Sequence, residues 1–224
     1  MTDRLQNWGR LALWAIPVYG ALLAVSTITK QPDYQTDFPA YARYITTTQF
    51  LVSHLIASIA GAGFGLVGAA ALFVLTDQLA PRQARWGFGL WAFAQAGLGS
   101  VFGVAAFFQP AIGRAFLDGS REIAVAINED VYGGPLFLMV GLSMLLFIMG
   151  GILLGIAATR PQSWPRWAGF TFAASITVFA IGNFADVPLL QPLAGLGIAW
   201  AGTRFALAAR RSAVERPHLR TSRG

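Results

Sequence analysis

The chain has 224 residues, of which 55% are hydrophobic and only 12% are charged, and its mean hydropathy is +0.56. Because soluble domains carry about 25% charged residues, this composition excludes a water-soluble fold. The sequence has no cysteine, which excludes disulfides, thiolate nucleophiles, iron–sulfur clusters and attached c-type haem. The net charge of +6 comes from basic residues at the ends of apolar segments, so nucleic-acid binding is not expected.

Apolar segments long enough to cross a bilayer recur along the chain. A transmembrane helix needs about 20 apolar residues to span roughly 30 Å of hydrocarbon. The sequence therefore predicts an all-α, polytopic bundle of six transmembrane helices, which forms one domain over residues 1–209. The predicted spans are residues 11–28, 50–76, 87–108, 135–158, 168–184 and 189–209. The basic remainder, residues 210–224, is predicted to be a disordered cytoplasmic tail.

The first connection, residues 30–49, contains a signal for the start of a helix. Asp37 precedes Pro39, and an acidic cap followed by proline in the first turn satisfies or removes free backbone N–H groups. We therefore expect the second helix to begin outside the membrane.

The second predicted span, residues 50–76, carries the only histidine expected inside the membrane. Residues three or four positions apart lie on the same face of a helix. One face of this span therefore carries only small or polar residues: His54, Ser58, Gly61, Gly65 and Gly68. Small residues let a second helix approach closely, so we expect His54 to face protein rather than lipid. The same reasoning predicts further packing positions at Gly99, Gly103, Gly151 and Gly155.

The longest connection, residues 109–134, has apolar residues at helical spacing beside charged ones. Ile112, Ala115 and Phe116 form one such group, and Ile123 and Ile127 belong to another. This pattern is typical of a short amphipathic helix that lies in the membrane interface.

Basic residues favour one orientation of the bundle. On the side opposite both termini, the predicted topology leaves only four basic residues: Lys30, Arg43, Arg114 and Arg121. Because cytoplasmic loops carry an excess of Lys and Arg, both termini are predicted to be cytoplasmic.

Polar groups inside a span are costly, so each is a functional hypothesis. The span centres contain no Asp, Glu or Lys, which argues against a carboxylate-driven transporter and a retinal Schiff base. Most of the remaining polar residues fall near the outer surface, which predicts an outward-opening pocket. Its candidate ligand-binding residues are His54, Ser58, Gln95, Gln109, Asn128, Asp130, Asn183, Asp186 and Gln191. A purely structural role for His54, hydrogen-bonded to a neighbouring helix, is the alternative.

No catalytic residue and no metal site is predicted, because no ligand-spacing motif is present. The sequence identifies no cofactor, and a single histidine within the spans excludes bis-histidine haem in this chain. Membrane lipid is the expected partner. Other membrane subunits or further copies of the chain are additional possibilities.

Three stretches of the sequence carry a family resemblance: LVSHLIASIAGAGFGLVGAAALF, GGILLGIAATRPQSWPRWAGFTFA and NEDVYGGPL. They resemble segments of small six-helix integral membrane proteins of high-GC bacteria, over most of the region of the spans. The resemblance implies a multi-pass bundle in the bacterial cytoplasmic (inner) membrane. It implies no activity and no catalytic residue.

Three function classes stay open. The favoured one is a non-catalytic membrane protein, either a subunit of a membrane complex or a binder of an apolar ligand such as a lipid, quinone or pigment. The second is a transporter or channel for a small neutral solute, with Gln95 midway along its path. The third is a membrane-embedded enzyme at the outer leaflet, with His54 as general base oriented by Asp130 or Asp186.

Overall fold

The computed structural model describes the backbone of residues 3–182, 187 and 189–221, and the side chains of these residues except Ala57 and residues 213–221. The described chain is 84% helix and contains no strand, which confirms the all-α prediction. In chain order the helices are α1 (Asp3–Ala12), α2 (Ala15–Ser26), α3 (Phe38–Ile45), α4 (Thr48–Val52), the π-helix η1 (Ser53–Ala60), α5 (Gly61–Thr76), α6 (Pro81–Leu117), α7 (Arg121–Tyr132), α8 (Gly134–Ala158), α9 (Arg166–Gly182) and α10 (Leu190–Thr221).

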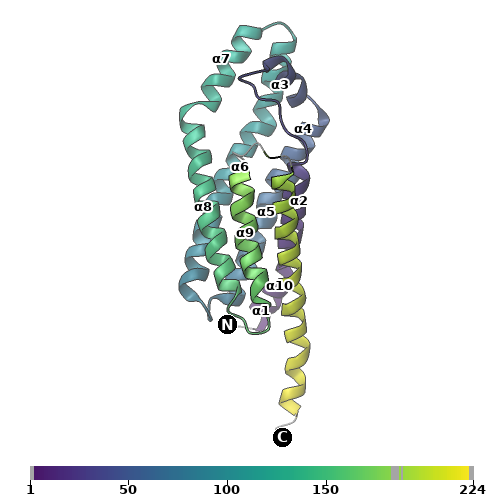
Figure 1. Cartoon of the computed structure of the whole chain (residues 1–224), viewed down its shortest axis with the longest axis vertical. Coiled ribbons are helices and arrows are strands. Elements are labelled where there is room, and N and C mark those ends of the chain that lie inside the picture. Colours follow the sequence, from purple (N-terminus) through teal and green to yellow (C-terminus); the bar gives the residue numbers. More distant parts are fainter. Residues whose placement is uncertain (1–2, 183–186, 188, 222–224) are drawn as a thin grey trace.

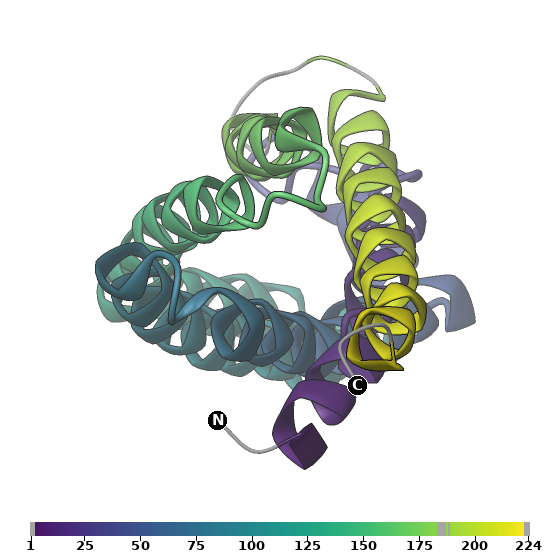
Figure 2. The same cartoon turned by 90° about the horizontal axis from the view of Figure 1, so that it is seen from below.

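The long helices form a closed ring. Around it, α2 packs against α10, α10 against α9, α9 against α8, α8 against α6, α6 against α5, and α5 against α2. Figure 2 shows this ring from the end at which both termini lie, and Figure 1 shows it from the side. We call the end with the termini the terminal end and the opposite end the head end.

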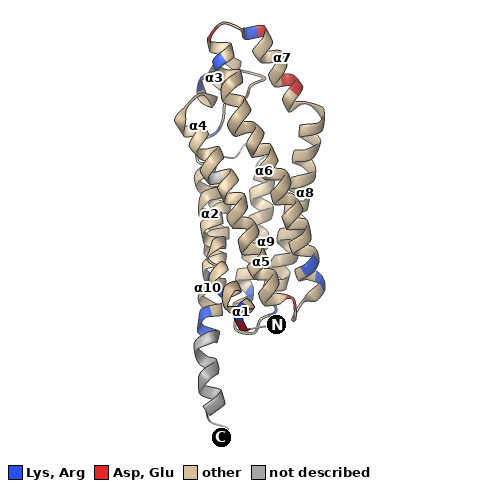
Figure 3. Cartoon of the chain, turned by 180° about the vertical axis from the view of Figure 1, so that it is seen from behind, with Lys and Arg blue, Asp and Glu red and all other residues tan. Residues whose placement is uncertain are grey.

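Four segments of the described chain are long and apolar enough to cross a membrane. They are Asp3–Ser26, Thr48–Thr76, Pro81–Leu117 and Gly134–Ala158. Helix α9 is apolar but shorter. Charged residues gather at the head end and the terminal end, and the length of the bundle between these ends has almost none (Figure 3).

Glycines allow several of the helix contacts. A methyl group added at Gly68 would lie 2.5 Å from Ile16 of α2, and one at Gly155 would lie 2.7 Å from the backbone oxygen of Gly169 in α9. Similar close approaches occur at Gly65 and Gly151, with a looser one at Gly61. At Gly155, α8 and α9 therefore pack nearly backbone to backbone, whereas the other glycines make room for a side chain of the neighbouring helix.

Two glycines of α6 that were predicted to be packing positions, Gly99 and Gly103, do not lie at a helix contact in the described part of the chain. Among the described atoms, nothing lies within 4 Å of a methyl group added at Gly99 or Gly103. Gly97 is the residue of this region that packs against α8, where it meets Ser143. The difference arises because the contact face of α6 is set by its position in the ring, which the spacing of glycines alone does not reveal.

At the head end, three helical segments form a small cap that we call the head: α3, the last turns of α6, and α7. Asp37 caps α3 as predicted, because its Oδ1 accepts a hydrogen bond from the backbone N–H of Ala40 at 2.9 Å. The core of the head includes buried Tyr41 and Ile45 packed with Phe50 and Ala105.

The head differs from the predicted connection in one respect. Helix α6 does not end near residue 108 but continues to Leu117, and at 1.5 Å per residue it is about 55 Å long, well beyond the thickness of a bilayer. Helix α7 then returns along it toward α8. The segment predicted as one amphipathic helix therefore consists of the last turns of α6 and of the separate helix α7.

At the other end of the chain, α10 runs on as a helix to Thr221, through most of the segment predicted to be disordered. Alanine and arginine, which dominate residues 206–213, are strong helix formers.

Candidate functional site

A π-helix interrupts the second membrane-length segment. Over η1 the backbone winds more widely than an α-helix, and the Ser58 hydroxyl donates a hydrogen bond to the carbonyl of Ser53, five residues earlier, at 3.3 Å. Such π-helical turns are rare and occur frequently at functional sites. This one carries both His54 and Ser58.

The imidazole of His54 has a defined hydrogen-bonding state. Its Nδ1 lies 3.0 Å from the carbonyl oxygen of Phe50, and its ring lies on the Phe50 ring with 4.1 Å between centroids. Because a carbonyl oxygen can only accept, Nδ1 carries the proton and donates to Phe50. In the neutral ring this leaves Nε2 as an acceptor, and it has no hydrogen-bond partner in the described part of the chain.

His54 lines a cavity of about 470 Å³ at the head end of the ring, which we call the His54 cavity. Its floor is mostly apolar and includes Leu23, Phe102, Met144 and Phe179 together with the hydroxyl of Ser58. Its rim is mostly polar and includes Thr29, Lys30, Tyr44, His54 and Gln191. The cavity therefore has an apolar inner part and a polar mouth.

Hydrogen bonds hold the rim together. The hydroxyls of Thr29 and Tyr44 lie 3.1 Å apart, and the side-chain amide of Gln49 donates to Thr29 at 3.3 Å. On the opposite wall, the side-chain amide of Gln191 donates to the carbonyl of Phe179 at 3.3 Å. These bonds tie the segment after α2 to α3 and α4, and α10 to α9.

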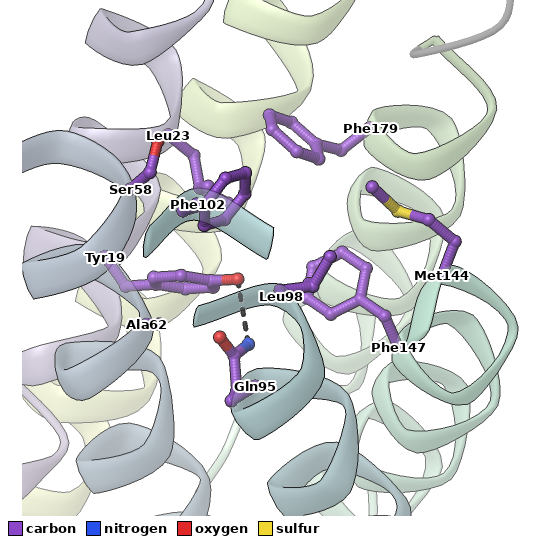
Figure 4. Close-up of a pocket in the computed structure, with 10 residues that line it drawn as sticks. All are labelled: Tyr19, Leu23, Ser58, Ala62, Gln95, Leu98, Phe102, Met144, Phe147 and Phe179. Atoms are coloured by element: carbon purple, nitrogen blue, oxygen red, sulfur yellow. Dashed lines mark hydrogen bonds between the residues drawn. The ribbon is translucent and has the colours of Figure 1, made fainter. Parts of the chain in front are cut away.

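A second, much smaller cavity of about 20 Å³ adjoins the first and shares all five of its floor residues. Figure 4 shows the residues that line this smaller cavity. Gln95 lines it and is 4% exposed. The Gln95 amide donates a hydrogen bond to the Tyr19 hydroxyl at 3.0 Å, drawn as a dashed line in Figure 4. A space of this size holds about one water molecule.

Aromatic side chains fill the interior beyond Gln95. Trp91 is 1% exposed, donates from its indole N–H to the carbonyl of Gly65 at 3.0 Å, and lies against Phe147 and Phe172 at centroid distances of 4.8 and 5.9 Å. All three rings are buried in the main core of the ring. The His54 cavity therefore ends at a packed aromatic layer.

The structure brings three of the candidate residues to the His54 cavity: His54, Ser58 and Gln191. Ser58 also lines the smaller cavity, where it is joined by Gln95. Gln109 and Asn128 belong instead to the head, and Asp130 is exposed on α7. Asn183 and Asp186 lie outside the described residues.

Gln109 and Asn128 form a separate buried polar cluster with tyrosines. The Tyr41 hydroxyl donates to Oδ1 of Asn128 at 3.0 Å, and Asn128 is 0% exposed. Within the described atoms, Oε1 of Gln109, Nδ2 of Asn128 and the Tyr132 hydroxyl are buried without a hydrogen-bond partner. Burial raises the pKa of the Tyr41 and Tyr132 hydroxyls above their ordinary value, so both phenols stay neutral at physiological pH.

Sequence reasoning did not identify the apolar floor of the His54 cavity. Phe102, Met144 and Phe179 are apolar residues inside apolar spans, and nothing in their spacing distinguishes a cavity wall from a helix contact or a lipid-facing position. Tyr44 carried a weak signal, because it is an aromatic residue with a hydroxyl close to a predicted membrane boundary.

Comparison with protein families, curated proteins and solved structures found no match to this chain. The resemblance to six-helix membrane proteins of high-GC bacteria therefore stays a prediction.

Proposed function

We propose that the chain is a six-span protein of a bacterial cytoplasmic membrane and that its His54 cavity binds an apolar molecule with an oxygen-bearing head group, of the lipid or quinone type. The proposal depends on one observation: the floor of this cavity is apolar and its mouth is polar. In this proposal both termini are cytoplasmic and the head lies on the outer side.

The closed ring supports six spans. Each long helix packs beside its neighbours around the ring. The two members outside the four membrane-length segments, α9 and α10, pack against the apolar helix α8 and against α2. A ring in which only four members crossed the bilayer would leave two members of the same bundle outside the hydrocarbon. The prevalence of Arg at the terminal end supports the cytoplasmic orientation.

The size and chemistry of the cavity support the ligand class. Sites for small molecules are usually apolar clefts of about 300–1,000 Å³ with a few polar groups that fix orientation, and this one measures about 470 Å³. An apolar body would contact Leu23, Phe102, Met144 and Phe179. A hydroxyl on the head group would donate to Nε2 of His54, and a carbonyl would accept from the donors of the rim.

The two other function classes have less support. A channel needs a continuous polar path, and the interior beyond Gln95 is filled by Trp91, Phe147 and Phe172. An enzyme with His54 as general base needs a carboxylate to orient the ring, but the described part of the cavity wall has none and Nδ1 is bonded to a carbonyl.

The experiment compares two tryptophan substitutions on α8. The protein is extracted together with surrounding membrane into lipid nanodiscs, and the small molecules that remain bound after purification are identified by mass spectrometry. Met144→Trp puts an indole ring into the apolar floor of the cavity and narrows it, whereas Met149→Trp places the same ring at an exposed position, 44% accessible, five residues further along.

We expect wild type and Met149→Trp to retain the same apolar, oxygen-bearing molecule at near-equal stoichiometry, and Met144→Trp to lose it. Elution as a single species on size-exclusion chromatography checks that each variant is folded. Retention of nothing by wild type, or equal retention by both variants, would contradict the proposal.

A further inference from the structure

A groove of about 460 Å³ lies at the terminal end, on the far side of the aromatic layer from the His54 cavity. It is formed by the turn between α8 and α9 and by the facing side of α10, and we call it the terminal groove. Its polar lining includes Gln162, Ser163, Arg204 and Arg211, and its apolar lining includes Trp164 and Leu207.

The two arginines of the groove lie on one face of α10. They are seven residues apart, which is about two helical turns or 10.5 Å along the axis. Both are exposed, and no Asp or Glu lines the groove or pairs with either arginine within the described side chains. Arg85, at the same end, differs because its Nε lies 2.8 Å from Oδ1 of Asp77. Among the described side chains, the positive charge of the groove is therefore not compensated.

Aromatic residues beside the groove indicate a membrane surface. The guanidinium of Arg204 lies 5.4 Å from the centre of the Trp167 ring, and Trp167 lies 4.2 Å from Trp200. Trp164 is buried against Phe205 at 5.3 Å and forms the apolar wall. Tryptophans gather at the level of lipid head groups, so in a membrane this groove would open at that level.

We propose that the terminal groove binds an anionic phospholipid of the leaflet at this end, with the phosphate held by Arg204 and Arg211. Guanidinium groups form short, paired hydrogen bonds to phosphate oxygens. Basic pockets between transmembrane helices on the cytoplasmic side are suited to acidic head groups. Gln162 and Ser163 supply neutral donors, and Trp164 and Leu207 supply a surface for the start of an acyl chain. The inference rests on the chain spanning a membrane and is independent of the ligand of the His54 cavity.

The test measures lipid binding by the full chain in detergent. Phosphatidylglycerol and phosphatidylcholine are titrated separately, and binding is followed by native mass spectrometry and by the shift in melting temperature. The variants are Arg204→Gln and Arg211→Gln, and the matched control is Arg210→Gln, which removes the same charge from an exposed neighbouring position outside the groove.

We expect phosphatidylglycerol, but not phosphatidylcholine, to bind and to raise the melting temperature. Arg204→Gln and Arg211→Gln should each weaken this binding about tenfold or more, because each removes a charge-assisted pair of hydrogen bonds. Arg210→Gln should change it less than about twofold, as expected for an exposed charge beyond direct contact. Met144→Trp should leave it unchanged, which separates this site from the His54 cavity.

Three results would overturn the inference. Equal weakening by Arg210→Gln and Arg211→Gln would mean that only the general charge of the terminal end attracts the lipid. Equal binding of phosphatidylcholine would remove the role of head-group charge. Complete displacement of phosphatidylglycerol by inorganic phosphate at millimolar concentration would assign the groove to free phosphate rather than to a lipid.

Discussion

The amide of Gln95 on α6 donates a hydrogen bond to the hydroxyl of Tyr19 on α2, with 3.0 Å between the two heavy atoms. These helices are not neighbours in the ring, since α5 packs between them. The bond therefore crosses the interior of the bundle just above the aromatic layer. It explains why a polar side chain is present at this depth without a path for a solute.

A double-mutant cycle measures this bond. Gln95→Leu and Tyr19→Phe are each expected to lower stability, and together they should cost less than the sum of the two single changes. The coupling should be about 0.6 kcal/mol, the average for hydrogen bonds between membrane helices, and no more than about 1.7 kcal/mol. Reversible unfolding in mixed micelles provides the measurement. Strict additivity would mean that the two groups do not interact.

Two glycine-to-alanine substitutions should have opposite effects on the stability of the bundle. Gly155→Ala places a methyl group 2.7 Å from the Gly169 oxygen and 2.8 Å from Cβ of Ala173, so α8 and α9 must separate at a cost of about 1–3 kcal/mol. Gly103→Ala meets no described atom within 4 Å and should be neutral or stabilise α6 by about 0.5–1 kcal/mol. Melting temperatures in one detergent test the pair. A Gly155→Ala variant as stable as wild type would mean that the two helices are further apart.

The two tyrosines of the buried head cluster should also respond differently to loss of the hydroxyl. Tyr41→Phe removes the donor to Asn128 and leaves a buried amide oxygen without a partner, which should cost about 1–3 kcal/mol. Tyr132→Phe removes a hydroxyl that lies near the Gln109 side chain but makes no well-formed hydrogen bond among the described atoms, so it should cost less than Tyr41→Phe. Thermal unfolding measures both. The opposite order would show that the Tyr132 hydroxyl is hydrogen-bonded, for example through an ordered water molecule.

The same tyrosines predict a loss of stability in alkali. Their pKa values in the folded head are raised above the ordinary value of 10.0, mainly by burial, whereas the unfolded chain loses these protons near pH 10. The folded state therefore binds more protons than the unfolded state above pH 10. Stability should be insensitive to these groups below that pH and should fall as the pH rises beyond it. Melting temperatures between about pH 8 and 11 test this, and Tyr132→Phe should make the fall less steep.

Much of the fold follows from hydropathy. Residues 50–76 and 135–158 were predicted as spans and correspond closely to Thr48–Thr76 and to α8, because a long apolar run has few structural alternatives. The Asp37 cap was also predictable, since it depends on a local hydrogen bond. The π-helix could not be predicted from the sequence, because no residue pattern distinguishes it from an α-helix.

The candidate site was only partly predictable. His54, Ser58 and Gln191 line one cavity. Gln109 and Asn128, which were predicted to belong to the same pocket, lie in the head instead. Depth along a span does not say which neighbours a side chain meets. The position of Gln109 depends on α6 continuing to Leu117, which the hydropathy of residues 87–108 does not indicate.

The topology is the central claim, and cysteine labelling tests it most directly. Because the chain has no cysteine, single cysteines can be placed at Gln35, Asp118 and Val187 on the head side and at Leu79 and Ser163 on the terminal side. In intact bacterial cells, a membrane-impermeant maleimide should label the first three, and the last two only after lysis. Labelling of Leu79→Cys or Ser163→Cys in intact cells, or protection of Val187→Cys until lysis, would contradict six spans with both termini in the cytoplasm.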